Sequence, residues 1–230
     1  MCCSPTHPGF RHCSSCEIVR RQLGGALFRV RPVRLAPRGG DLHRHLVAYK
    51  AAPSPAVRSA AASRLADLLA SYLVCVVARA GTGSRTVRRP VIAVATVPSS
   101  GAGRSSWHGT HPLSNVVRMA CSRLERGSAG LSGSVHHAAD LLERGPGPLG
   151  HRRAALDGYL VARPARVGDA PLLVVDDLYT SGARAQSAAY ACSAAGLTVL
   201  AIAPLGRLVE QGGGAAPVAS RTTSLAAKAR

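Results

Sequence analysis

One stretch constrains the fold of this chain more than any other: PLLVVDDLYTSGAR, residues 171–184. Four apolar residues (172–175) form the short continuous run that a buried parallel strand shows. Asp176 and Asp177 follow at once, and the Ala-rich residues 183–195 then read as a helix. A strand, a polar turn and a helix in this order predict an α/β fold with a mainly parallel central sheet flanked by helices.

The polar groups in this stretch lie where strand becomes helix, at the end of a sheet where ligands bind in α/β folds. The N–H groups that open a helix bind phosphate, and Thr180, Ser181 and Gly182 add two hydroxyls and an unhindered backbone approach. Asp176 and Asp177 can accept hydrogen bonds from vicinal sugar hydroxyls and attract a divalent cation. The alternative is an ordinary strand–turn–helix whose acids are merely solvated.

The stretch resembles the phosphoribosyl-pyrophosphate (PRPP) binding motif of the type I phosphoribosyltransferases. That motif has four apolar residues, two acids, two mostly aliphatic residues and a hydroxyl-rich phosphate loop, and Tyr179 is the departure from it. The resemblance implies Asp176 and Asp177 as catalytic residues that orient ribose. It also implies that the 5′-phosphate is held by a loop consisting of Thr180, Ser181, Gly182, Ala183 and Arg184.

A second apolar run, residues 91–97, opens into a loop rich in Ser and Gly. It predicts another strand followed by a polar loop. In the family this loop holds pyrophosphate, so the resemblance assigns that role to Ser99, Ser100 and Arg104. The Val97-Pro98-Ser99 start is similar to that of the ComF-like branch. Taken alone, a Ser/Gly/Pro loop is more often only a loop.

The implied reaction is phosphoribosyl transfer to an unidentified acceptor with release of pyrophosphate, assisted by Mg²⁺. Purine-specific relatives commonly carry a third acid at the position of Thr180, so its absence argues against purine salvage. Two other functions stay open: a PRPP-sensing regulator without turnover, and a ComF-like accessory protein for DNA uptake or nucleic-acid handling.

The N-terminus contains four of the seven cysteines, an odd total that argues against a disulfide framework. Cys13 and Cys16 form a C-x-x-C pair, and with Cys3 and His7 they would suit zinc. ComF-like proteins have a similar N-terminal cysteine knuckle, but this chain lacks the second C-x-x-C pair. A cluster without metal is therefore an equal alternative. Cys75, Cys121 and Cys192 are expected to be buried small hydrophobes.

Three regions are predicted: a cysteine-rich head (1–24), a phosphoribosyltransferase-like domain (45–210) and a disordered basic tail (211–230). Within the domain we expect a long amphipathic helix from Pro55, a helix at 111–123 and strands at 156–162 and 197–205. Residues 27–49 read as a short strand and loop ending in Tyr49-Lys50, and residues 125–153 as a closing loop around one short helical run. Lys50, Arg152 and Arg153 are basic groups that could reach phosphate from these segments.

The net charge of +18 makes the chain strongly cationic. Polyanions, including nucleic acids, would bind such a surface at low salt. A specific nucleic-acid site is not indicated, because the basic residues are scattered and only 3% of residues are aromatic. No uninterrupted apolar stretch of membrane-spanning length and no signal-like N-terminus is seen, which predicts a cytoplasmic protein without a membrane partner. PRPP and an acceptor are the expected partners, and a homodimer stays open.

Overall fold

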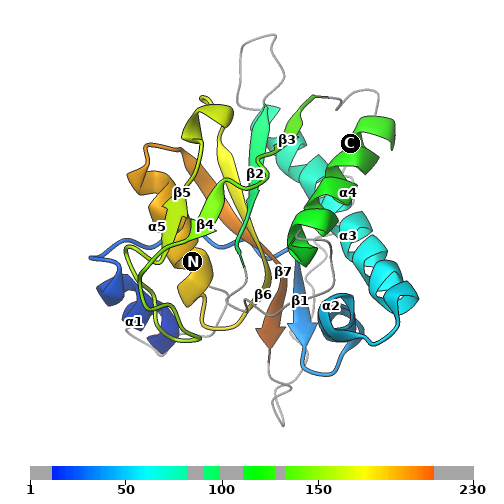
Figure 1. Cartoon of the computed structure of the whole chain (residues 1–230), viewed down its shortest axis with the longest axis horizontal. Helices are drawn as coiled ribbons and strands as arrows, with labels where there is room; N and C mark the ends of the chain where they lie inside the picture. Colours follow the sequence, from blue (N-terminus) through cyan, green and yellow to red (C-terminus); the bar gives the residue numbers. More distant parts are fainter. Residues whose placement is uncertain (1–11, 82–90, 99–110, 128–132, 210–230) are drawn as a thin grey trace, which may run out of the picture.

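A five-stranded, all-parallel sheet forms the centre of the fold, as the sequence predicts (Figure 1). The computed structural model describes residues 12–81, 91–98, 111–127 and 133–209. The sheet has the strand order β1-β7-β6-β2-β3. Its strands are β1 (Arg34–Pro37), β2 (Ile92–Thr96), β3 (Val135–His137), β6 (Leu172–Tyr179) and β7 (Val199–Val209).

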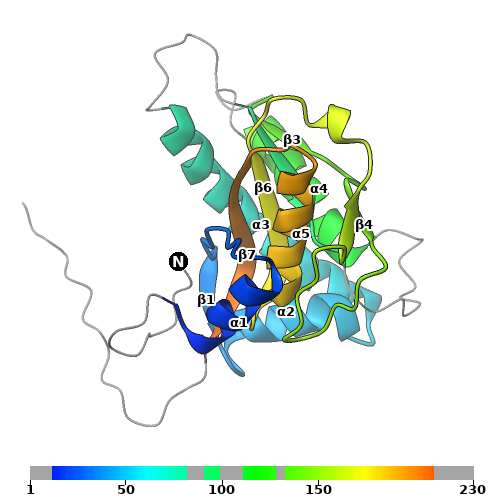
Figure 2. The same ribbon diagram turned by 90° about the vertical axis from the view of Figure 1, so that its left-hand side faces the viewer.

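Helices cover both faces of this sheet. On one face lie α2 (Asp41–Ala51), α3 (Pro55–Gly81) and α4 (Pro112–Gly127), and on the other lie α5 (Ala183–Ala194) and α1 (Ser14–Gln22) (Figures 1 and 2). Alternation along β6 assigns its side chains to the two faces. Leu173 and Val175 pack in the core under α3 and α4, whereas Leu172 and Val174 pack in the core under α5. The apolar run 172–175 is continuous because both faces of the strand are buried.

A small antiparallel hairpin lies beside α5, outside the main sheet. It consists of β4 (Leu142–Arg144) and β5 (Tyr159–Val161), and the short 3₁₀ helix η1 (Pro164–Arg166) follows it. Tyr159 is buried in the α5-side core. The loop between β4 and β5, residues 145–158, reaches α1, where the Ala154 N–H donates to Gln22 Oε1 at 2.8 Å. The N-terminal helix therefore supports this loop.

The N-terminal half of β7 has a further neighbour in the segment that follows α1. Val30 pairs with Ile202 in a parallel bridge, and the N–H groups of Arg31 and Val33 donate to carbonyls of β7. Buried Gln186 of α5 fixes the same segment, because its amide both accepts from the Phe28 N–H (2.8 Å) and donates to the Phe28 carbonyl (2.9 Å). The sheet thus begins ahead of residue 45, the start predicted for the domain.

Most predicted elements are present. The strands expected at 91–97, 172–175 and 197–205 and the helices expected from Pro55, at 111–123 and at 183–195 correspond to β2, β6, β7, α3, α4 and α5. The expected strand at 156–162 is found as β5, but in the hairpin and not in the main sheet.

Three local predictions are wrong. Residues 41–51 form helix α2 and not a loop, because Leu42, Leu46 and Tyr49 recur at helical spacing and pack in the core. The described part of residues 125–153 contains the end of α4 and two strands, β3 and β4, in place of a short helix, since pairing with β2 and β5 overrides local helix propensity. Cys75 is exposed, whereas Cys121 and Cys192 are buried as predicted. The tail from residue 210 lies outside the described residues.

Helix α3 is the one helix among the described residues that is long and apolar enough to cross a membrane. Length and composition do not decide its environment, because the core helix of a folded domain has the same properties. Leu65, Leu69 and Leu73 lie on one side of α3 and are fully buried in the core with strand residues such as Leu173. This packing accounts for the apolar character of α3.

Leu69 offers a direct test of that packing. Leu69→Ala should lower the free energy of unfolding by about 2 to 5 kcal/mol, because it removes buried methyl groups and leaves a cavity in a close-packed core. Val74→Ala on the exposed part of the same helix is the matched control and should change little. Urea unfolding followed by circular dichroism measures both. Equal effects of the two substitutions would show that α3 does not pack as described.

Candidate functional site

The predicted acidic pair lies at the carboxyl end of β6, at a topological switch point of the sheet. From β2 the chain continues to β3 on one side, whereas from β6 it continues to β7 on the other. In open α/β sheets the crevice at such a point is where ligands bind. Strand β2 ends beside the acids, since the Val97 N–H donates to the Val175 carbonyl at 2.9 Å.

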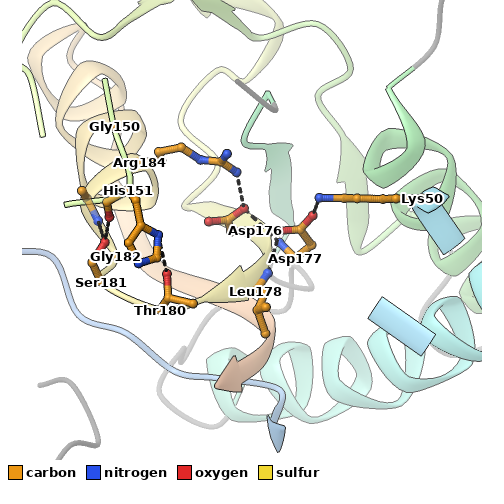
Figure 3. Close-up of a pocket in the computed structure, with 11 residues that line it drawn as sticks. Lys50, Gly150, His151, Asp176, Asp177, Leu178, Thr180, Ser181, Gly182 and Arg184 are labelled. Carbon is orange, nitrogen blue, oxygen red and sulfur yellow. Dashed lines mark hydrogen bonds and ion pairs between the residues drawn. The ribbon is translucent and has the colours of Figure 1, made fainter. Parts of the chain in front are cut away.

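Strand alternation sends the two adjacent carboxylates to opposite faces of the sheet. Asp176 follows Val174 toward α5, where Arg184 Nη2 lies 3.7 Å from its Oδ1. Asp177 follows Val175 toward α2, where it accepts a hydrogen bond from the Tyr49 hydroxyl at 2.7 Å and forms an ion pair with Lys50. Figure 3 shows Arg184 and Lys50 approaching the acids from the two sides.

Burial changes the proton affinity of this cluster. Asp176 is only 4% exposed, and desolvation raises its pKa to about 6 despite the opposing charges of Arg184 and Lys50. Desolvation also lowers the pKa of Lys50 and raises that of Tyr49. The charged form of Asp176 therefore depends on the neighbouring cations, and any ligand that draws those cations away must replace their charge.

The turn after β6 is shaped by close packing as well as by its polar groups. Gly182, the N-cap of α5, has φ = 78°, a left-handed conformation that favours glycine. A Cβ at this position would meet the Tyr179 hydroxyl at 2.0 Å. Tyr179, the departure from the family motif, thus packs beneath the turn, where its ring also lies 5.3 Å from the guanidinium of Arg207.

The β4–β5 loop covers this turn. The Ser181 hydroxyl donates to the main-chain carbonyl of His151, and Thr180 Oγ1 lies 3.3 Å from His151 Nδ1. Sequence analysis pointed to Arg152 and Arg153 in this loop, but Gly150 and His151 are the loop residues that line the cavity. Both predicted hydroxyl groups therefore have protein partners in this structure.

The acids, the turn and the loop enclose a cavity of about 380 Å³ (Figure 3). Its walls contain both acids, the cations Lys50 and Arg184, and the N-terminus of α5. Hydrogen-bond acceptors and donors therefore line the same cavity. The lining residues are Lys50, Gly150, His151, Asp176, Asp177, Leu178, Thr180, Ser181, Gly182, Ala183 and Arg184. The predicted acidic pair, the predicted phosphate loop and Lys50 are all brought together here.

The start of α4 lies near the same site. Burial and the positive charges of Lys50 and Arg184 lower the pKa of His111 to about 4, so this imidazole is neutral at pH 7. Sequence analysis gave His111 no role, because no ligand-like spacing marks it. The predicted pyrophosphate residues Ser99, Ser100 and Arg104 lie outside the described residues.

The N-terminal cysteines are only partly described. Cys13 precedes α1 and Cys16 is buried in its first turn, while Cys3 and His7 lie outside the described residues. Over the described ranges, no group of three or more His, Cys, Asp or Glu side chains is arranged to hold a metal ion. Zinc binding by the head stays a prediction.

Comparisons with known proteins give no identity for this chain: no family model and no curated protein matches it.

Asp176 makes the stability of the protein dependent on pH. Its pKa is raised in the fold, so its favourable contribution is complete below about pH 4 and is lost as the pH rises through about 6. Asp176→Asn keeps an oxygen that can accept from the Asp177 N–H and removes the buried charge. At pH 8 this variant should be more stable than wild type by about 1 to 3 kcal/mol, and the difference should vanish near pH 4.

Chemical denaturation at pH 4, 6 and 8 measures this effect. Asp41→Asn, which alters an exposed acid on α2, is the control and should not show the same pH dependence. A variant no more stable than wild type at pH 8 would contradict the assigned cost of burying Asp176.

Proposed function

We propose that the protein binds PRPP in this cavity and transfers its phosphoribosyl group to an acceptor, as a type I phosphoribosyltransferase. The observation that carries the proposal is the convergence, around one cavity, of an acidic pair, two cations and a helix N-terminus at a sheet switch point. A sugar phosphate needs this combination, since its hydroxyls donate to carboxylates and its phosphate binds N–H groups and cations.

The 5′-phosphate binds at the first turn of α5. A bond from the Gln186 N–H to the Gly182 carbonyl opens that helix, and the Ala183 N–H donates to the Ser181 hydroxyl at 3.4 Å. The helix N-terminus carries a partial positive charge that favours a phosphate at this end. Arg184 lies in the same turn and adds a positive charge. The Ser181 hydroxyl is already bonded to the loop, so this residue contributes its backbone N–H to the cradle.

Ribose hydroxyls bind at the carboxylates, and binding exchanges their partners. Lys50 and Arg184 turn from Asp177 and Asp176 toward phosphate oxygens, and the acids then accept hydrogen bonds from the ribose. Tyr49 stays beneath Asp177 and holds the orientation of that carboxylate. Neutral hydroxyls do not replace the charge of the two cations, so a Mg²⁺ ion bound with the substrate would supply it.

The acidic pair fits a Mg²⁺ ion that arrives with the substrate. Mg²⁺ keeps several water ligands and uses one or two carboxylates together with phosphate oxygens. With both acids engaged by cations, the described residues offer no all-protein metal cage. When bound, Mg²⁺ neutralises charge on the pyrophosphate group.

Transfer breaks the bond between C1 of ribose and the pyrophosphate oxygen and forms a bond from C1 to the acceptor. The electron pair of the broken bond leaves with pyrophosphate, and positive charge develops at the sugar ring. The carboxylates of Asp176 and Asp177 stabilise that charge and hold the ribose in position. The acceptor is a nucleophile whose proton is lost during the transfer.

Isothermal titration with PRPP and Mg²⁺ tests binding. Asp177→Asn should weaken PRPP binding about tenfold to a hundredfold, because it removes a charged acceptor for ribose hydroxyls. Inorganic pyrophosphate titrated without Mg²⁺ has no sugar hydroxyls and needs no metal at the acids, so the same variant should bind it at least as well as wild type does. Asp41→Asn should bind both ligands normally. Wild type that ignores millimolar PRPP would refute the proposal.

Turnover is measured separately, as pyrophosphate release with a panel of bases and amines. Binding without release for every acceptor would favour a PRPP-sensing regulator. Gly182 variants are unsuitable as probes of phosphate binding, since any side chain collides with Tyr179 before a ligand is present.

A further inference from the structure

The loop between β4 and β5 is held rigidly where it covers the candidate site. At its base, the Gly145 N–H donates to the Gly158 carbonyl and the Gly147 N–H to the Asp157 carbonyl. Two side chains from neighbouring helices fix its far arm: Gln22 accepts from the Ala154 N–H, and Ser187 from the Ala155 N–H at 3.0 Å. These contacts fix the position of the tip of the loop, residues 150–153.

The tip places one imidazole at the phosphate end of the cavity. His151 is attached at two points: its carbonyl accepts from the Ser181 hydroxyl, and its Nδ1 lies 3.3 Å from Thr180 Oγ1. In Figure 3 its ring lies beside Thr180, across the cavity from Lys50. The hydrogen bond from the Ser181 hydroxyl to the His151 carbonyl already anchors the loop to the turn and needs no particular side chain. The contact between the His151 ring and Thr180 is therefore open to a second role.

We propose that His151 is a phosphate-binding residue, donating an imidazole N–H to the phosphate monoester that sits on the first turn of α5. This inference rests on the proposed function, because it takes the phosphate position from it. Thr180 engages Nδ1 and thereby orients the ring, which leaves Nε2 to donate to an oxygen of the ligand. The arrangement surrounds the phosphate with groups from three elements: Lys50 from α2, Arg184 from α5 and His151 from the loop.

The role of His151 differs from that of the two arginines beside it. His151, Arg152 and Arg153 are all exposed, but His151 lines the cavity and the two arginines do not. Phosphate recognition in this loop therefore falls to His151, whose ring lies beside Thr180 at the cavity.

Ribose 5-phosphate is the probe, because it presents the phosphate monoester without pyrophosphate. Titration calorimetry should show that His151→Ala binds it about tenfold more weakly than wild type, and that His151→Gln recovers part of the loss by donating an amide N–H. His136→Ala, which alters an exposed histidine on β3, is the matched control and should bind normally. In NMR spectra, the wild-type imidazole signals missing from His151→Gln should shift when ribose 5-phosphate is added.

Equal affinity of His151→Ala and wild type, or imidazole signals that do not move, would overturn the inference. So would a His151→Gln variant that binds as weakly as His151→Ala, because that result indicates a structural role for the loop. Wild type that binds PRPP while His151→Ala binds ribose 5-phosphate normally would refute the inference alone. His151-dependent binding of ribose 5-phosphate without any binding of PRPP would refute the proposed function alone.

Discussion

The structure is organised around the cost of burying two neighbouring carboxylates at the end of one strand. Strand β6 is covered on both faces, so neither Asp176 nor Asp177 can turn to open water. Because adjacent side chains of a strand point to opposite faces, each acid has its own ion-pair partner. The protein supplies one from each layer, Arg184 on the α5 side and Lys50 on the α2 side. The placement of α2 and α5 is thus coupled to the same two residues.

Much of this arrangement follows from local sequence. The continuous apolar runs of β2 and β6 predict strands buried on both faces, and periodic leucines predict the core face of α3. The position of the acids between strand and helix predicts where a ligand would bind, since parallel strands end at one edge of the sheet. These features depend on residues close together in the chain. The strands and the core face lie where expected, and the acids line a cavity at that edge of the sheet.

Other features depend on contacts between distant residues, which no local pattern specifies. Tyr49 and Lys50 meet Asp177 only because α2 is packed against the end of β6. The sequence predicts that Gly182 lets a phosphate approach the backbone. Its left-handed conformation and its close contact with the Tyr179 ring also require glycine at this position. His151 had no recognisable signal in the sequence, since the loop that carries it is ordered by Gln22 and Ser187.

The order of strands also determines when the protein can fold. Strand β7 is the last strand described, yet it lies between β6 and β1 and also bonds the segment around Val30. During synthesis, the residues from Val30 to Pro37 therefore wait without their partner strand until about 200 residues have been made. Non-local pairing of this kind is slow and leaves strand edges exposed. A ribosome-bound chain would thus hold an unfinished sheet, and β7 would complete the core when it emerges.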